Sequence, residues 1–496
     1  MHSIAAHAVP GCSFIAANFN LSARPELHHA NRFLRPRGPD ATTVRSLGND
    51  WSFLHNLLSM TGAVTTQPFI SADGRRAAVF NGEIYNFRAL ARQLAGSADA
   101  YASDGFALLP AYERWGVSFV QHLEGEFALV VVDLDRRRAV VSADVFGTKP
   151  LWFAIWQPTQ APAPPRILVA TYESALLALG APRASIKAAP PNEALVVRFG
   201  EAQPRKGVPL VRWDLRQHKN HTNDWAAAFR EAVRVRTRGV KHRIFIGLSS
   251  GYDSGAILGA LALERTPFLA YAIKAQEDVG VLAARARYCE GVGEVALLQL
   301  SGSRFAREER WLAQRCEKYS YEMEARKGEL ACSDEGAVGV SVVLGRVRRR
   351  GGLIYLSGSG SDEIISDYAR NGRKIYPHSC FGGRWPADLA PIFPWCSFYG
   401  GSQRAFLMKE ELVSGAHGIE GRYPFLDPKV VQEFLWLKPE LKNAEYKKPV
   451  ADFLRAHRVP TAWGRKIGFT AGRDTDATAL AAGAAREPLL HGEVLT

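Results

Sequence analysis

The pattern of apolar and polar residues divides the chain into two regions with different secondary structure. From Cys12 to about Pro204, short apolar runs alternate with Gly, Asp, Asn and Pro residues. Repeated strands separated by turn residues predict a layered α+β domain, with helical spacing at residues 87–95 and 105–115. The expected strands include residues 13–17, 77–80, 127–133, 139–142, 167–170 and 194–198.

From about Trp225 onward, buried apolar runs alternate with helix-like segments. This alternation is typical of a doubly wound parallel sheet, in which a ligand binds at the carboxyl ends of the strands. The expected strands are residues 244–248, 268–273, 295–300 and 353–356. We therefore expect an α/β protein with domains at residues 1–204 and 225–476, a linker at 205–224 and a mobile tail at 477–496.

One strand end carries a loop suited to phosphate. After residues 244–248 the chain turns to small hydroxylated residues and resumes as a helix near Asp253 or Ser254. The free amides and the dipole at a helix start attract an anion, and Asp253 would repel phosphate unless Mg²⁺ lay between them. The alternative is an ordinary turn in which Asp253 or Ser254 caps the helix. The expected phosphate-loop residues are Leu248, Ser249, Ser250, Gly251, Asp253 and Ser254.

Composition indicates a folded protein that acts on small molecules. The chain has 496 residues, is 47% hydrophobic and has a net charge of +13. Its basic residues are scattered apart from one run at 346–350, which favours ATP and a carboxylate over nucleic acid. No apolar run approaches a membrane span and no export signal is visible. The six cysteines lack paired spacing, so we expect reduced thiols, neither a disulfide framework nor a zinc site, and a cytoplasmic location.

Two motifs of the second region resemble those of the asparagine synthetases. The loop 249–254 is similar to Ser-Gly-Gly-x-Asp-Ser of the ATP pyrophosphatases that form acyl-adenylates, with Ser250 replacing the first glycine. The segment Leu353-Ile-Tyr-Leu-Ser-Gly-Ser-Gly-Ser-Asp-Glu363 is similar to the asparagine synthetase motif Leu-Ser-Gly-Glu-Gly-Ser-Asp-Glu. The resemblance implies nucleotide contacts from Ser357 and Gly358, and Mg²⁺ held by Asp362 together with Asp253. A plain Gly/Ser loop is the alternative for the second motif alone.

Two later segments fit the same family. Gly418-Ile-Glu-Gly-Arg-Tyr-Pro-Phe-Leu-Asp427 resembles Glu-x-Arg-x-Pro-Phe-Leu-Asp, and residues 465–469 resemble the family's closing Lys/Arg segment. By this match Lys466 reaches the pyrophosphate or the transition-state oxyanion, unless it is a solvated surface lysine. Glu420 and Arg422 fit an internal ion pair better than a catalytic role.

The first region resembles the glutaminase domain of class II glutamine amidotransferases, which are N-terminal-nucleophile (Ntn-type) proteins. The matching motifs are Arg37-Gly-Pro-Asp40, Asn81-Gly-Glu-Ile-Tyr-Asn86, Ser103-Asp104, Gly125-Glu-Phe-Ala128 and Phe146-Gly-Thr-Lys-Pro-Leu151. In that family an N-terminal cysteine attacks the glutamine amide, with its own α-amine as the base. The match implies a nucleophile, two oxyanion donors and two acids that face the glutamine ammonium: Cys12, then Asn81 and Gly82, then Glu83 and Asp104.

Two departures predict an impaired glutaminase. Position 2 is His2, and Cys12 lies behind eleven residues, so inside the chain it has no free α-amine. Leu57 replaces the arginine that would bind the glutamine carboxylate, a loss on the order of a few kcal/mol. The alternative is a true glutamine-dependent amidotransferase, activated when removal of a propeptide exposes Cys12.

The acceptor site also departs from the asparagine synthetase pattern. Ser359 stands where the family has glutamate and where relatives that close β-lactam rings have tyrosine as part of a base system. Serine alone is no effective base, so another residue accepts the proton or the nucleophile arrives as ammonia or an amine. Ser366-Asp-Tyr368 and Val450-Ala451 differ as well, which predicts an acceptor other than aspartate.

These observations predict an ATP- and Mg²⁺-dependent ligase that adenylates a small-molecule carboxylate and forms an amide with an amine, ammonia or glutamine-derived nitrogen. No nucleic-acid or membrane partner is expected. A non-catalytic binding protein is a further alternative, because Ser250, Ser359 and Leu57 all depart from the motifs. The sequence leaves open the acid, the nitrogen source, the catalytic base and whether the chain forms a homodimer.

Overall fold

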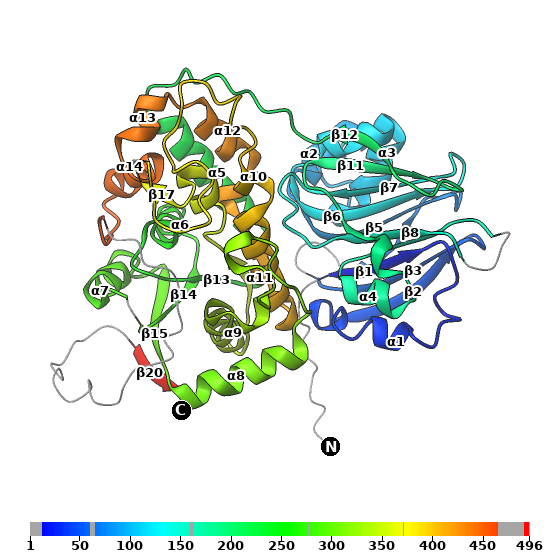
Figure 1. Ribbon diagram of the computed structural model, residues 1–496, viewed down its shortest axis with the longest axis horizontal. Coiled ribbons are helices and arrows are strands. Elements are labelled where there is room, and N and C mark those ends of the chain that lie inside the picture. The colour runs from blue at the N-terminus through cyan, green and yellow to red at the C-terminus, as the bar shows by residue number, and fades with distance from the viewer. Residues whose placement is uncertain are drawn as a thin grey trace. The chain divides into compact units, whose positions relative to one another are not determined.

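The computed structural model describes residues 12–59, 65–158, 163–275, 277–370, 372–464 and 491–495. The chain forms two compact units. One comprises residues up to Arg212 with Ser414–Glu420, and the other comprises Trp213–Val413 with the residues from Gly421 onward. The first is built on antiparallel sheets and the second on a parallel sheet between helices, which confirms the predicted α/β class (Figure 1).

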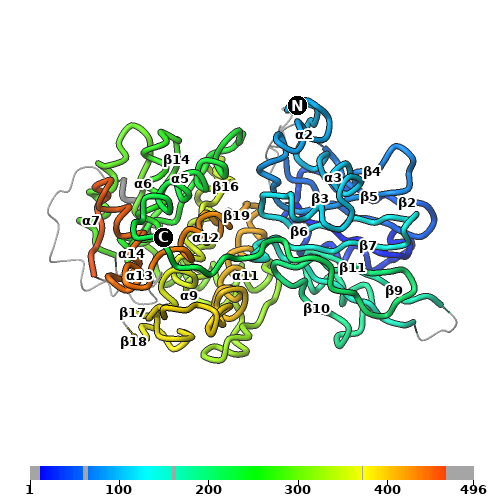
Figure 2. The backbone as a smooth tube through the Cα atoms, turned by 90° about the horizontal axis from the view of Figure 1, so that it is seen from above, coloured from blue at the N-terminus to red at the C-terminus, as the bar shows by residue number. Residues whose placement is uncertain are grey.

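Two six-stranded sheets share one core in the first unit. Phe14 and Phe53 of one sheet and Val79, Val130 and Val141 of the other are fully buried in this core. The backbone can be followed from β2 to β11 in Figure 2. One sheet has the order β10 (Ile186–Ala188), β8 (Trp152–Trp156), β9 (Arg166–Ala170), β1 (Ser13–Ala17), β3 (Trp51–Leu57), β2 (Ala41–Leu47). The other has the order β12 (Arg205–Pro209), β11 (Glu193–Arg198), β7 (Arg138–Ala143), β6 (Gly125–Asp133), β5 (Arg76–Ile84), β4 (Phe69–Ile70).

Short helices complete the first unit. They are α1 (Leu27–Ala30), α2 (Phe87–Ala95), α3 (Leu108–Trp115) and α4 (Glu173–Ala178). The helix expected at 105–115 begins instead with a separate 3₁₀ turn, Asp104–Ala107. Gly105 in that turn packs so closely on Phe69 that an added Cβ would lie 2.3 Å from the phenylalanine ring. This close packing brings Asp104 to the end of β5.

The second unit has a six-stranded sheet with the predicted strands side by side and parallel. Its order is β19 (Glu420–Arg422), β16 (Gly352–Leu356), β13 (Arg243–Gly247), β14 (Phe268–Ile273), β15 (Gly293–Leu300), β20 (His491–Leu495). Helices α5 (Asn223–Thr237) and α6 (Tyr252–Leu263) lie on one side of this sheet, and α9 (Glu335–Arg348) lies on the other (Figure 1). The sheet is therefore wound on both faces, as the alternation of strands and helices predicts.

Further helices belong to the second unit, and only the first two of them follow the expected α/β alternation. They are α7 (Val279–Tyr288), α8 (Gly302–Arg315), α10 (Cys396–Tyr399), α11 (Gly401–Ala416), α12 (Pro428–Trp436), α13 (Pro439–Ala444) and α14 (Lys448–Ala456). Among the described residues, no helix is long and apolar enough to cross a membrane.

Two segments differ from their expected description. The stretch expected as a linker begins with β12, because Arg205–Pro209 pair with β11 at the edge of the sheet. The stretch expected as a mobile tail contains β20, whose residues 491–495 pair in parallel with β15. The first strand was not predicted because its sequence is polar. The second was not predicted because alanine-rich sequence surrounds it.

The expectation that all cysteines are reduced is wrong. Cys380 and Cys396 form a disulfide, with a Cα–Cα distance of 5.9 Å. The carboxylate of Asp367 holds the start of the loop between the two cysteines, because it accepts hydrogen bonds from the amides of Cys380 (2.9 Å) and Phe381 (2.8 Å). The 16-residue separation of the two cysteines has no recognisable motif, so sequence reasoning missed the bond.

Candidate active site

The loop between β13 and α6 has the strand, loop and helix arrangement predicted for phosphate binding. Ser249 N donates to Ser254 Oγ (3.0 Å), and Gly251 N donates to Ser249 Oγ (3.2 Å). The helix begins at Tyr252, with Gly251 as its N-cap and no side chain capping it. Asp253 and Ser254 lie inside the helix, so the alternative in which one of them is the cap is wrong. The exposed end of the helix retains amides for an anion.

Ser250 is held by an acid that the sequence motifs did not indicate. Its amide and its hydroxyl both donate to Glu277 Oε2, at 2.5 and 2.6 Å. Ser250 is not among the residues with a left-handed backbone, so serine fits where relatives have glycine. Glu277 therefore fixes the middle of the loop.

Arg285 holds the same loop in place through hydrogen bonds to its backbone. Its guanidinium, buried completely, donates to the carbonyls of Gly251 (2.7 Å), Pro460 (2.8 Å) and Ser249. Burial lowers the pKa of this guanidinium to about 10. A Cβ on Gly255 would lie 2.2 Å from Arg285 Nη2, so the helix needs glycine there. Arg285 lies in α7, outside any motif, and the sequence gave no signal for it.

The two predicted metal-binding carboxylates meet at one cation. Lys447 Nζ lies 2.6 Å from Asp253 Oδ1 and 2.8 Å from Asp362 Oδ1. Ser361 Oγ donates to Asp253 (2.6 Å), and Tyr446 Oη donates to Asp362 (2.9 Å). Burial would lower the pKa of the Lys447 ammonium, but the two carboxylates outweigh it and raise that pKa.

This arrangement fits magnesium by the chemistry of its donors. Asp253 and Asp362 supply hard carboxylate oxygens from the ends of two neighbouring strands. Magnesium prefers one or two carboxylates together with phosphate oxygens, and the α6 amides lie next to Asp253. Lys447 shows that the position between the two acids accepts a cation. Its only sequence signal is the Lys447-Lys448 pair.

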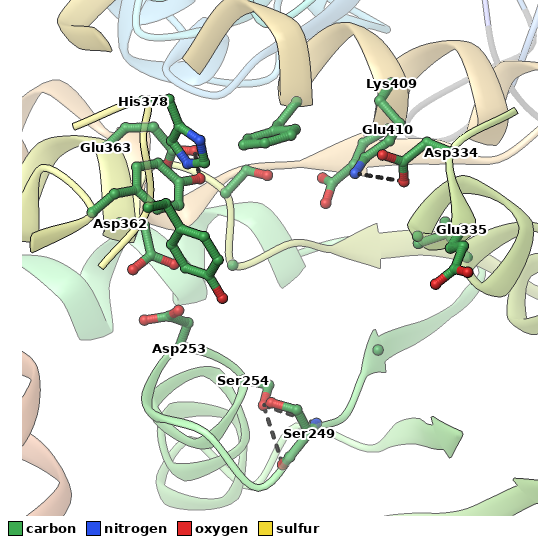
Figure 3. Close-up of a pocket in the computed structure, with 18 of the residues that line it drawn as sticks. Ser249, Asp253, Ser254, Asp334, Glu335, Asp362, Glu363, His378, Lys409 and Glu410 are labelled. Atoms are coloured by element: carbon green, nitrogen blue, oxygen red, sulfur yellow. Dashed lines mark hydrogen bonds and ion pairs between the residues drawn. The ribbon is translucent and has the colours of Figure 1, made fainter. Parts of the chain in front are cut away.

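A cavity of about 650 Å³ opens beside these residues, and Figure 3 shows its charged groups. Ser249, Ser254, Asp253, Asp362, Gly358 and Ser359 line it at the phosphate end. Lys409, Glu410, Asp334 and Glu335 line it at the other side (Figure 3). The predicted phosphate loop and the second motif therefore share one cavity, whereas the predicted Lys466 lies outside the described residues.

Glu410 is a partly exposed acid of this cavity that sequence reasoning missed. Ser357 Oγ donates to Glu410 Oε2 at 2.5 Å, and Ser359 N donates to Ser357 Oγ at 3.0 Å. Burial raises the pKa of the Glu410 carboxyl to about 7. A carboxyl that titrates near neutrality is suited to accept a proton at physiological pH. Glu410 lies on α11, outside every motif.

The predicted glutamine-site residues meet in the first unit. Cys12, Gly82, Glu83 and Asp104 line a small cavity, next to the buried Asn81. Gly82 has a φ of 120°, and an added Cβ would lie 1.9 Å from Glu126 O, so only glycine fits. Asp104 accepts hydrogen bonds from the amides of Ile84 and Gly105, both at 2.9 Å, and burial raises its pKa to about 6.

The two departures also meet at this cavity. Leu57 lines it with an apolar side chain where the family pattern has arginine. Leu58 N donates to Cys12 Sγ at 3.3 Å, and burial raises the pKa of the Cys12 thiol far above its usual value. Burial therefore disfavours the thiolate of Cys12, which is the nucleophilic form.

Known proteins match both regions. Residues 11–206 match the model of the glutamine amidotransferase domain, and residues 402–490 match that of asparagine synthase. A protein of Methanocaldococcus jannaschii assigned as a glutamine-hydrolysing asparagine synthetase is 26% identical over 406 residues, 79% of this chain and 70% of its own. A Schizosaccharomyces pombe protein with the same assignment is 24% identical over 450 residues, 84% of this chain and 74% of its own. An amidase of Gibberella zeae is 27% identical over 267 residues, 48% of this chain and 39% of its own.

The matched models follow one another in the order in which the two units occur, and the full-length relatives span both. The sequence motifs at Asp253 and Asp362 meet in one cavity of the second unit. On these grounds the chain is similar to the asparagine synthetase family over both of its units.

Proposed function

We propose that this ATP-dependent carbon–nitrogen ligase forms an amide by way of an acyl-adenylate. A carboxylate oxygen of the substrate attacks the α-phosphorus of ATP, and pyrophosphate leaves. A nitrogen nucleophile then attacks the acyl carbon, loses a proton and displaces AMP. Adenylation replaces a poor leaving group by a good one, which is the reason to use ATP in this way.

One observation carries the proposal. Asp253 and Asp362 come from the ends of neighbouring strands and converge on one cation beside the free amides of α6. Leaving pyrophosphate carries negative charge, which the helix start and its surrounding hydroxyls would receive. Bound Mg²⁺ would supply further positive charge at the phosphates, with Asp253 and Asp362 as its protein ligands. Ser357 and Gly358, at the end of β16, would contact the nucleotide.

The position of Lys447 suggests a role for its ammonium in this scheme. Before ATP binds, its ammonium holds the two carboxylates together. When phosphates enter, the same ammonium would keep Asp253 and Asp362 close together at the phosphate end. Lys466, predicted for the pyrophosphate from the sequence, stays part of the proposal as a second cation.

Glu410 is our candidate for the base. Its pKa of about 7 leaves a large fraction ionised at neutral pH, and it lines the cavity beside Ser359. The proton lost by the attacking ammonia or amine would pass to Glu410 Oε1 or Oε2. This assignment accounts for Ser359, because serine at that position then needs to accept no proton itself.

The first unit belongs to the proposal as an impaired glutaminase. The apolar Leu57 and the protonated Cys12 thiol favour this reading over an active one. A glutamine-dependent enzyme is the second candidate, favoured by the meeting of Cys12 with Gly82, Glu83 and Asp104 at one cavity. Glutaminase activity of a protein whose first residue is Cys12 would distinguish the two. A cytoplasmic location and a homodimer stay predictions from the sequence.

The test is exchange of labelled pyrophosphate into ATP, measured with aspartate and with a panel of other organic acids. Asp253→Asn should lower the exchange about a hundredfold or more, because charge at the departing phosphates loses its metal ligand. Asp388→Asn, at an exposed position of the same unit, is the matched control. Full exchange in the Asp253 variant would contradict the proposed site.

A further inference from the structure

Aromatic side chains form one wall of the active-site cavity. His378 lies edge-on to Tyr368, with a ring-centroid distance of 4.2 Å, and stacks on Tyr376 at 5.4 Å. Phe406 of α11 completes the wall, 5.8 Å from His378. Figure 3 shows His378 at one side of the cavity, above Glu363 and Asp362. This wall, defined as Tyr368, Tyr376, His378 and Phe406, offers ring faces and edges to a bound molecule.

The cavity lining also includes apolar residues outside the aromatic wall. Val340 of α9 lines the cavity and remains partly exposed, although it lies between buried residues of that helix. Tyr355 of β16 lines it too, stacked on Phe245 with centroids 5.2 Å apart. Gly247 contributes no side chain at this point. A flat apolar body therefore finds both aromatic and aliphatic side chains in the cavity lining.

The charges of the cavity disfavour a second carboxylate on the substrate. Among the described lining residues, Arg326 and Lys409 both pair with Asp334, the latter at 3.3 Å. Arg326 also pairs with Glu329 at 2.7 Å. The acids Glu335, Glu363 and Glu410 line the same space. The second carboxylate of an aspartate-like substrate would need Arg326 or Lys409 as its partner, and both already pair with Asp334. It would also be repelled by the other acids that line the cavity.

The aromatic wall is held in place by the fold. Tyr376 and His378 lie just before Cys380, which the disulfide joins to Cys396. The carboxylate of Asp367 fixes the same segment by accepting from the Cys380 and Phe381 amides and from Ser379 Oγ (2.9 Å). A wall fixed before binding loses little conformational entropy when a ligand arrives, which strengthens binding.

We infer that the acid which this enzyme activates is an aromatic monocarboxylic acid. Its carboxylate points to the phosphate end at Asp253 and Ser249, and its ring lies between the aromatic wall and Val340. The inference rests on the proposed adenylation only for the fate of the carboxylate; binding of the acid is independent of it.

Calorimetric titration of phenylacetate and of aspartate tests the inference, each into the full-length protein with Mg²⁺ and a non-hydrolysable ATP analogue. Phenylacetate should bind at least about tenfold more tightly than aspartate, in keeping with the energy of aromatic contacts. Val340→Phe should fill the space and weaken phenylacetate binding about tenfold or more, whereas Val340→Ala should retain it. Both variants should bind the ATP analogue as the wild type does.

A second variant, Phe406→Ala, keeps the inference testable if Val340→Phe does not fold. Phe406→Ala should weaken phenylacetate binding, whereas Phe393→Ala, a partly buried aromatic residue outside the cavity, should not. Aspartate binding as tight as phenylacetate binding, or unchanged phenylacetate binding in both Val340→Phe and Phe406→Ala, would overturn the inference. Pyrophosphate exchange separates the two proposals. Exchange with aspartate alone supports adenylation and refutes the aromatic acid, whereas the expected binding pattern without exchange supports the aromatic acid and refutes adenylation.

Discussion

The Lys447 ammonium, 1% exposed, lies 2.6 Å from the carboxylate of Asp253, although the two residues are 194 positions apart in the chain. Asp362 lies on its other side at 2.8 Å. One buried cation thus neutralises two acids that would otherwise repel each other at the end of the parallel sheet.

Replacement of this cation should destabilise the protein in a way that magnesium reverses. Lys447→Met leaves two close carboxylates, and we expect the free energy of unfolding to fall by about 2 kcal/mol, since both acids keep some contact with water. Mg²⁺ should then raise the melting temperature of the variant more than that of the wild type, because it replaces the lost charge. Calorimetry at pH 7 measures both effects.

Lys448→Met is the matched control for this experiment. Lys448 pairs with Asp452 at 2.5 Å on the same helix and is itself partly exposed, so its loss should change stability little. Equal magnesium shifts in wild type and Lys447→Met would contradict the assignment of Asp253 and Asp362 as the metal ligands.

Glu410 should give the reaction a pH dependence near neutrality. Burial raises its pKa from 4.5 to about 7, so the folded protein prefers the protonated form. Stability from this group is fully present below pH 4.5 and is lost as the pH rises through about 7. Activity should rise over the same interval, because only the ionised carboxylate accepts a proton.

The measurement is kcat/KM for amide formation between pH 5.5 and 8.5. In Glu410→Gln the rising limb should disappear and the rate should fall about a hundredfold, within the usual contribution of a general base. Pyrophosphate exchange should persist, since adenylation precedes the proton transfer. A wild-type pH profile in Glu410→Gln would assign the base to another residue.

Much of the site followed from local sequence. The run 244–254 predicted a strand, a loop and a helix, and these place Ser249, Ser254 and Asp253 where they were expected. Asp362 joined Asp253 because neighbouring parallel strands end at the same edge of a sheet. Such predictions rest on contacts between residues close in sequence, or on strand order.

The groups that sequence reasoning missed act over long separations. Arg285 reaches the loop at Ser249 from 36 residues away, and Glu277 reaches Ser250 from 27. Glu410 meets Ser357 across 53 residues. In the sequence each of these residues is an ordinary charged residue outside any motif. Only the packing of α7 and α11 shows what Arg285 and Glu410 contact. The disulfide was missed for the same reason.

Arg285 should matter for the shape of the phosphate loop rather than for its charge. Arg285→Met removes three hydrogen bonds to partly buried backbone carbonyls, and we expect a loss of about 3 kcal/mol in stability. The ATP analogue should bind more weakly, as titration calorimetry would show. Arg287→Met, two residues on and exposed, should behave as the wild type. Retained stability in Arg285→Met would mean that water replaces the guanidinium without loss.

The disulfide should contribute both stability and affinity. Reduction of Cys380–Cys396 frees a loop of 16-residue span, and we expect a stability loss of about 3 kcal/mol. Phenylacetate affinity should fall as well, because the disulfide anchors Cys380, which lies two residues after His378 of the aromatic wall. Melting curves with and without dithiothreitol measure the first effect. The Cys380→Ser/Cys396→Ser double variant serves as the control, since its melting curve should not respond to the reductant.

Leu57 offers a test of why the first unit should be a poor glutaminase. Its apolar side chain lines the cavity that also contains Glu83 and Asp104, so the cavity has acids for the glutamine ammonium and lacks the family's arginine for the carboxylate. In a protein whose first residue is Cys12, Leu57→Arg should therefore lower the KM for glutamine about tenfold or more, the worth of a charge-assisted hydrogen bond. Leu57→Met, which changes shape without charge, should leave the KM as it was. A fall in KM with Leu57→Met, or none with Leu57→Arg, would show that the missing arginine does not limit glutamine binding.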